Sequence, residues 1–164
     1  GFEVSEILIQ PNPLHVNLKN ALSKIRSFAG WKLAELWMPS YDGMYLTCQV
    51  ADVESNEADE LILHFISQTN DTDYPISTYI NQAEHISNKP YWIEDIVSSE
   101  FNFKRKEAAL SAGFQSALAV PVMSDERMIC CFFFLNQQHK KFNRNECMVA
   151  DIRTFSRATN PQRF

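Results

Sequence analysis

The hydrophobic residues of this chain follow two periods, and their alternation predicts the order of helices and strands. Apolar side chains at every third or fourth position indicate an amphipathic helix, whereas short, dense apolar runs bounded by turn residues indicate strands. The predicted elements are a helix over 14–28, strands over 31–38 and 44–51, a helix around 61–66, an amphipathic segment over 76–86, a strand over 91–96, a helix over 103–112, strands over 114–123 and 128–136, and a helix over 143–159.

Within these elements the apolar positions assign an inner face. Residues that recur at helical spacing should share one helix stripe, and alternate residues of a strand should share one side of a sheet. The expected inner residues are Leu14, Leu18, Ala21, Leu22, Ile25 and Phe28 in the first helix, Met44, Leu46, Cys48 and Val50 in the second strand, and Leu61, Ile62, Phe65 and Ile66 in the next helix.

Turn residues separate the predicted elements. Asn12-Pro13 is typical of a helix start, and Gly30 suits the left-handed residue that ends one. Asp42-Gly43 indicates a hairpin. The polar turn 124–127 joins the last two strands, so these also form a hairpin.

The last two strands are apolar at both alternating sets of positions, so they should be buried on both faces. The predicted fold is therefore α+β: a central antiparallel sheet of about five to six strands, sandwiched between two layers. The first and last helices are expected on one face of the sheet. The middle helices and loops would cover the other face and could enclose a ligand pocket.

Composition and charge narrow the classes of partner. The chain has 164 residues, enough for one domain, and a formal net charge of −5. Binding to nucleic acid requires clustered Lys and Arg, and the densest basic cluster is only the short run 104–106. We therefore expect no nucleic-acid partner. The longest apolar run, 128–135, is far shorter than the roughly 20 residues that cross a bilayer, so no membrane contact by this domain is expected.

The cysteines and histidines do not form a recognisable site. The four cysteines (Cys48, Cys130, Cys131 and Cys147) lack the CxxC spacing of zinc and redox sites. We interpret them as reduced, small hydrophobic residues, which suits a cytoplasmic location. No HxxxH or HExxH pairing is present, so no metal site is predicted.

The segment 88–96, NKPYWIEDI, places aromatic residues beside two carboxylates. Glu94 and Asp95 are neighbours in a strand and diverge to opposite faces, whereas paired-carboxylate catalysis needs both groups to converge on one bond. A catalytic role is therefore disfavoured. The same alternation puts Tyr91 and Trp92 on opposite faces, and either could be the inner one. Asp95 is well placed to cap the following turn.

Several motifs occur in an order that resembles the GAF domain. They are the early strand GWKLAELW, the strand PYWIED, the helix FKRKEAA, the strand GFQSALAVPV, and a hairpin followed by a helix that Phe142 opens. The resemblance covers roughly residues 14–158, leaving 1–13 as an N-terminal extension and 159–164 as a tail. It implies a noncatalytic sensory or regulatory module of a cytoplasmic signalling protein, in particular a histidine kinase. Such modules bind a small molecule between the sheet and the middle helices, or form a homodimer through the terminal helices.

Departures from the family pattern bear on the ligand. The usual glycine-rich turn is absent from 74–78. In the signature of cyclic-nucleotide-binding members, Gln137 and Asn145 replace a lysine and an aspartate, which disfavours cyclic GMP and cyclic AMP. No Cys-His pair is present, so no covalently attached bilin, and no other covalent cofactor, is expected. The cysteines also do not resemble those of methionine-sulfoxide-reducing members.

The candidate pocket residues follow from the elements that would line the inner face. Arg105 could anchor a carboxylate or phosphate with its planar guanidinium, although a solvated position beside Lys104 and Lys106 is the alternative. The full set of candidates is Tyr91, Trp92, Asp95, Phe101, Arg105, Phe114, Ser116 and Phe133. The ligand itself is not identified. The alternatives are a ligand-free dimerisation spacer, whose aromatic side chains fill the pocket, and a chromophore- or haem-binding sensor.

Overall fold

The computed structural model describes residues 6–7, 9–54, 59–75, 90–99, 104–125 and 127–141. The predicted segment over 76–86 and the predicted last helix lie outside these residues. The strands are β1 (Leu33–Pro39), β2 (Tyr45–Val53), β3 (Tyr74–Pro75), β4 (Tyr91–Ile93), β5 (Ser116–Ser124) and β6 (Arg127–Asn136). The helices are α2 (Leu14–Ala29), α3 (Glu60–Asn70) and α5 (Lys106–Ser111).

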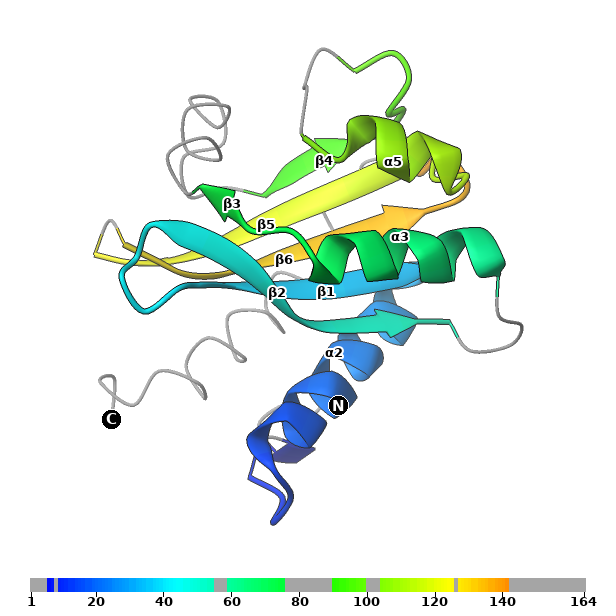
Figure 1. Ribbon diagram of the computed structural model, residues 1–164. Helices are drawn as coiled ribbons and strands as arrows, with labels where there is room; N and C mark the ends of the chain where they lie inside the picture. Colours follow the sequence, from blue (N-terminus) through cyan, green and yellow to red (C-terminus); the bar gives the residue numbers. More distant parts are fainter. Residues whose placement is uncertain are drawn as a thin grey trace.

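The strands form one six-stranded sheet in the order β3-β2-β1-β6-β5-β4. Every neighbouring pair is antiparallel, and β1 and β6 occupy the centre. Figure 1 shows α2 on one side of the sheet and α3 with α5 on the other. The predicted α+β class and antiparallel sheet are confirmed.

Two hydrophobic clusters fill the two sides of the sheet. The α2 side holds the buried residues of that helix with Trp31 and one alternating set of strand residues, including Phe132 and Phe134. The α3 and α5 side holds Phe65, Ala109 and the other alternating set, including Phe133. The central strands are therefore buried on both faces, as the sequence predicted.

Local signals set the ends of the elements. Gly30 adopts φ 75°, and its N–H and that of Trp31 bond to carbonyls in the last turn of α2. A left-handed residue with this bonding ends a helix, and glycine adopts it without a steric penalty. At the hairpin, Gly43 adopts φ 74° and Asp42 accepts a hydrogen bond from the backbone N–H of Met44.

The predicted face of β2 is wrong beyond Cys48, because the strand contains a β-bulge. Trp37 pairs with Cys48 and Leu36 pairs with Val50, so Gln49 is the extra residue. A bulge reverses the alternation of side chains that follow it. Leu46 consequently packs on the α3 side, whereas Val50 packs on the α2 side.

Three residues expected in helix stripes are exposed. Leu14 and Phe28 lie at the two ends of α2 and are 66% and 59% exposed, and Leu61 in α3 is 57% exposed. Figure 1 shows the first turns of α2 directed away from the sheet, so Leu14 has no strand beneath it. Leu61 lies in the first turn of α3, where only its neighbour Ile62 is buried.

Candidate functional site

A carboxylate lies at the centre of the sheet, under α3 and α5. Glu35 is the third residue of β1, flanked across the sheet by Ala51 of β2 and Phe133 of β6. Its side chain is fully buried. Strand alternation turns Glu35 toward α3 and α5, whereas its neighbours Ala34 and Leu36 face α2. A charge in this position requires a partner, because an unpaired buried charge is strongly destabilising.

Arg105 is that partner. It immediately precedes α5, and its Nη2 and Nη1 donate to Oε1 and Oε2 of Glu35 at 2.6 Å and 2.9 Å. Two parallel bonds between a guanidinium and a carboxylate form the strongest common type of ion pair. Arg105 is only 8% exposed, so the solvated alternative from the sequence is wrong. The alternative in which Arg105 anchors the carboxylate or phosphate of a ligand must also be revised, because the carboxylate of Glu35 already binds its guanidinium.

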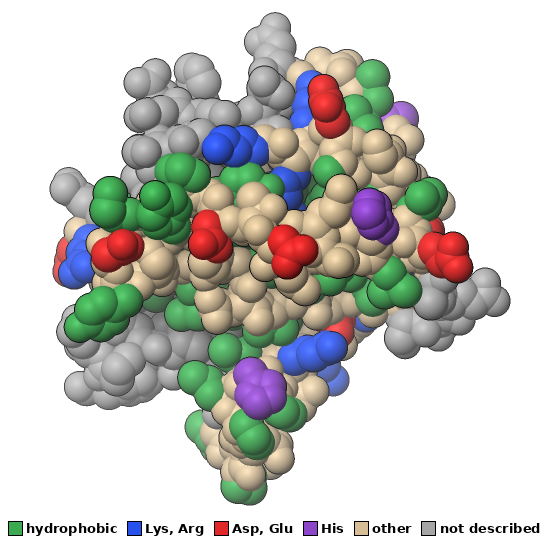
Figure 2. All heavy atoms as spheres, viewed as in Figure 1, with side chains coloured by type: hydrophobic (Ala, Val, Ile, Leu, Met, Phe, Trp, Pro, Cys, Tyr) green, Lys and Arg blue, Asp and Glu red, His purple; other side chains and the backbone are tan. Residues whose placement is uncertain are grey.

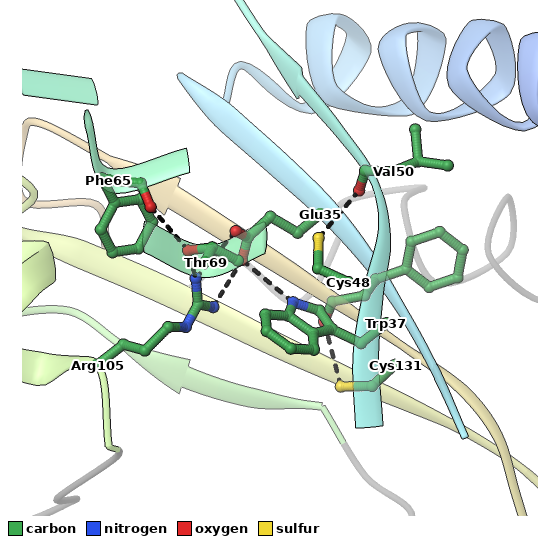
Figure 3. A network of polar contacts seen from close by, with 9 residues as sticks. Glu35, Trp37, Cys48, Val50, Phe65, Thr69, Arg105 and Cys131 are labelled. Atoms are coloured by element: carbon green, nitrogen blue, oxygen red, sulfur yellow. Dashed lines mark hydrogen bonds and ion pairs between the residues drawn. The ribbon is translucent and has the colours of Figure 1, made fainter. Parts of the chain in front are cut away.

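Two further donors and acceptors complete the polar network (Figure 3). Nη1 of Arg105 donates to Oγ1 of Thr69 at 2.9 Å, and that hydroxyl donates to the carbonyl of Phe65 one turn earlier in α3. The indole N–H of Trp37 donates to Oε1 of Glu35 at 3.2 Å. The network thus joins β1, α3 and the residue before α5.

Aromatic rings surround the guanidinium. Its Cζ atom lies 4.8 Å from the ring centre of Trp37, 5.0 Å from Phe65, 5.1 Å from Phe133 and 6.0 Å from Tyr74. Each distance is within the ~6 Å over which an aromatic face attracts a cation. We name the group formed by Glu35, Thr69 and these four rings the Glu35 cage.

Burial and charge shift several pKa values around the cage. Burial opposes the charged form of Arg105, but the charge and hydrogen bonds of Glu35 outweigh it, and the pKa of Arg105 is raised. Burial, together with the charge of Glu35, raises the pKa of the Cys48 thiol well above its ordinary value. A thiol of this kind stays protonated at neutral pH and is a poor nucleophile. The arrangement therefore suits binding through charge and aromatic contact.

The structure brings three further predicted site residues together with Arg105 on this face. Phe133 contacts the guanidinium of Arg105, and Phe114 packs edge-on against Phe65 with ring centres 5.3 Å apart. Tyr91 packs at the margin of the same hydrophobic cluster. Phe101 lies outside the described residues.

Three others are directed elsewhere. Trp92 faces the α2 side, where its ring centre lies 5.3 Å from that of Trp31, and its indole N–H donates to the carbonyl of Lys140. The hydroxyl of Ser116 donates to the carbonyl of Gln138 at 2.6 Å. Asp95 lies at the surface, where it accepts bonds from the N–H of Val97 and the hydroxyl of Ser98. These bonds, with that of Ser98 the largest cause, lower the pKa of Asp95. The predicted capping role of Asp95 is confirmed.

Sequence reasoning missed Glu35, Thr69 and most of the rings. One signal could have identified Glu35, since it is the only charged residue in the β1 sequence LAELWMP, a strand otherwise read as apolar. A charge in a strand that the fold buries on both faces predicts a buried ion pair. Its partner lies 70 residues further along the chain, and no local pattern connects the two.

Metal ligands do not gather in the part of the chain that the structure describes, which contains no group of three or more His, Cys, Asp or Glu side chains placed for a metal. His15, His64 and His139 are exposed, and His85 lies outside the described residues.

The surface charge is mixed: Figure 2 shows Lys and Arg side chains scattered among acidic ones over the viewed face. None of the described helices is long and apolar enough to cross a membrane.

Several solved structures share this fold. A domain of a protein assigned as a two-component sensor histidine kinase from Sinorhizobium meliloti aligns with a TM-score of 0.60 and 15% identity, covering 93% of this chain and 90% of that chain. The GAF domain of an Acinetobacter phosphoenolpyruvate-protein phosphotransferase aligns with a TM-score of 0.62 and 14% identity, covering 93% and 82%. Free methionine-R-sulfoxide reductase from Neisseria meningitidis aligns with a TM-score of 0.63 and 13% identity, covering 96% and 86%.

At these identities the alignments establish the fold alone. No curated protein sequence is significantly similar to this chain. The model of the GAF domain family matches residues 13–158, which is most of the chain. The chain therefore belongs to the GAF domain family, whose members serve as sensory and regulatory modules in signal transduction.

Proposed function

We propose that this GAF domain is a noncatalytic sensory module of a cytoplasmic signalling protein, a histidine kinase in particular, and that it binds a small molecule under α3 and α5. The observation that carries the proposal is the Glu35 cage itself. A buried ion pair seldom improves stability over a well-packed apolar core of the same volume, so its presence favours a role in recognition or switching. The similarity to a domain assigned to a sensor histidine kinase supports this kind of parent protein.

The position of Glu35 in β1 supplies a route from the site to the other face. Glu35 is bonded to Arg105, the residue before α5, and Arg105 is bonded in turn to Thr69 of α3. Ala34 and Leu36, the neighbours of Glu35 in the strand, belong to the cluster packed under α2. A ligand that alters the cage thus acts one strand away from the helix that we propose carries the signal within a homodimer. It shifts the position of α2 only if it binds one arrangement more tightly than the other.

A thermal-shift screen of metabolites tests the proposal. A ligand of the cage should raise the melting temperature of the wild-type domain. The double variant E35Q/R105M removes both charges and leaves no unpaired one, so it should fold but lose the shift. Light scattering after size exclusion should give the mass of a dimer. If the ligand raises the melting temperature of the double variant as much as that of the wild type, it binds outside the cage. A monomeric mass at all protein concentrations would exclude the homodimer.

One observation favours a second candidate, a ligand-free dimerisation spacer. The guanidinium of Arg105 is bonded by Glu35 and Thr69 and surrounded by four rings of the same chain, so the space is already filled. A spacer predicts a dimer that no compound of the screen stabilises. It also predicts that E35Q/R105M leaves signalling by the full-length protein unchanged.

A further inference from the structure

The guanidinium of Arg105 occupies the Glu35 cage as a bound ligand would. The carboxylate and two rings of the cage, Trp37 and Phe133, come from the central strands β1 and β6, which have strands on both sides. The cation comes from the residue before α5, a helix of six residues. The carboxylate and two of the four rings that contact the cation are therefore anchored in the central strands, whereas a short peripheral element supplies the cation.

Charge balance limits what can replace Arg105. A neutral molecule in its place would leave Glu35, which is fully buried, without a counter-charge. An anion would put a second negative charge beside the carboxylate. Only a cation restores both the ion pair and the contacts with the rings, and aromatic cages with a carboxylate suit amines, guanidinium groups and quaternary ammonium groups.

We infer that the Glu35 cage is a site for an organic cation, an amine or guanidinium group carried by a small molecule, which binds in exchange for the Arg105 side chain. The inference rests on the proposed function and narrows its ligand to one charge class. Exchange would release Arg105, and with it the hydrogen bond that ties the residue before α5 to Thr69 of α3, while the new cation keeps Glu35 paired. Ligand binding would thus be coupled to the packing of α5 on α3.

The exchange can be tested by supplying the cation to a variant that lacks it. Arg105→Ala opens the space of the side chain and leaves Glu35 unpaired. Ethylguanidinium at millimolar concentration should raise the melting temperature of this variant, by about 3–6 °C for each tenfold increase above the dissociation constant. Ethylurea has a similar shape without the charge and should have no effect. If Arg105→Ala is unfolded, ethylguanidinium should restore its near-ultraviolet circular dichroism.

Two variants control for non-specific effects. E35Q/R105A keeps the space but removes the carboxylate, so ethylguanidinium should no longer stabilise it. Arg26→Ala breaks a second arginine–carboxylate pair of the described residues, a partly buried one in which Nε of Arg26 lies 2.7 Å from Oδ2 of Asp52. Asp52 remains 12% exposed, so we expect no comparable stabilisation of Arg26→Ala. Equal stabilisation of Arg105→Ala by ethylguanidinium and ethylurea, or no stabilisation by either, would overturn the inference.

The outcome separates this inference from the proposed function. A cation that competes with Arg105 should bind Arg105→Ala more tightly than the wild type, whereas an anion anchored by Arg105 should lose its affinity for that variant. Stabilisation of the wild type by a carboxylate or phosphate compound that Arg105→Ala abolishes would overturn the cation class and still support a ligand site under α3 and α5. Failure of the whole wild-type screen, with rescue of Arg105→Ala by ethylguanidinium intact, would instead count against the sensory role.

Discussion

Two arginines in this domain each pair with a strand carboxylate, and their surroundings differ. Arg105 is bonded to Glu35, which has no contact with solvent, whereas the partner of Arg26 remains partly exposed. Desolvation and attraction nearly cancel in a buried pair, so its presence adds little net stability, but removal of one member leaves a charge without compensation. The two pairs therefore allow that cost to be measured in one protein.

Arg105→Ala should lower the free energy of unfolding by about 3–5 kcal/mol, because Glu35 then stays buried without a counter-charge. Arg26→Ala should cost less, since water can reach Asp52. E35Q/R105M should recover most of the loss. Urea denaturation of the four proteins provides the measurement, and a double variant as unstable as Arg105→Ala would contradict the argument.

At the scale of single elements, helix α3 carries a residue of the cage at one end and a cap at the other. In the last turn, Oγ1 of Thr69 accepts a hydrogen bond from Nη1 of Arg105. At the start of the helix, the carboxylate of Asp59 accepts a hydrogen bond from the N–H of Leu61. The helix also depends on Gln137, whose side-chain amide donates to Asp59. Its position over the sheet is therefore fixed at both ends by polar contacts with distant segments.

Thr69→Val should destabilise the domain by about 1–3 kcal/mol, because a buried donor of Arg105 loses its acceptor. Thr72→Val is the matched control: Thr72 bonds the carbonyl four residues earlier in the same way, but at the surface and without an arginine. Its effect should stay within about 0.5 kcal/mol. Chemical denaturation measures both, and equal losses would show that the bond to Arg105 contributes nothing.

The cap of α3 should make stability depend on pH in the acid range. The hydrogen bond from Gln137, followed by those from the backbone of α3, lowers the pKa of Asp59. Because the folded-state pKa lies below that of the unfolded chain, the carboxylate contributes its full stabilisation above the unfolded-state pKa, and this contribution is lost as pH falls through the lower folded-state pKa. Wild type should therefore melt above Asp59→Asn at pH 6, and the difference between their melting temperatures should shrink as pH falls below about 4.

The opposite end of α3 supplies the control. Asp71 follows the C-terminus of α3, where its negative charge is repelled by the negative end of the helix dipole. Asp71→Asn should therefore raise the melting temperature at pH 6. Thermal melts at several pH values measure both variants. A difference between wild type and Asp59→Asn that is the same at pH 6 and pH 3 would show that the charge of Asp59 is irrelevant to the cap.

At the scale of the whole molecule, the sheet is a single layer between two cores. Its central strands contribute alternate residues to each core, so loss of packing on one face exposes apolar side chains of the same strands that support the other core.

The described cysteines lie in both cores. Cys130 lies in the α2 core, whereas Cys131 and Cys48 lie on the α3 side. Burial raises the pKa of Cys48 and of Cys130.

The buried thiols of Cys130 and Cys131 should react only when the domain opens. In a Cys48→Ser/Cys147→Ser background, which removes the half-buried cysteine and the cysteine outside the described residues, labelling by a disulfide reagent at pH 8 should be slower than in urea by several orders of magnitude. The labelling rate of the native protein should follow the unfolding equilibrium as urea is added. Rapid labelling of one thiol without urea would reveal separate opening of the core that contains it.

The sequence alone determined the order of the described elements apart from the two-residue strand β3, which it did not predict. It also determined the antiparallel sheet between two layers, the turns at Gly30 and Gly43, and the resemblance to GAF domains. These features depend on local signals, namely apolar period, turn chemistry and short motifs, each read within about ten residues. Strand alternation likewise predicted that Tyr91 and Trp92 diverge, although not which of them faces α3.

Only the tertiary structure decided the site. Period alone cannot reveal the bulge at Gln49, because an extra residue changes the alternation without changing composition. Arg105, next to Lys104 and Lys106, has the sequence context of a solvated residue, and Glu35 that of an isolated polar residue in a strand. The fold brings them together across 70 residues and buries both. Their pairing follows from long-range packing, and the charge class of the proposed ligand follows from their pairing.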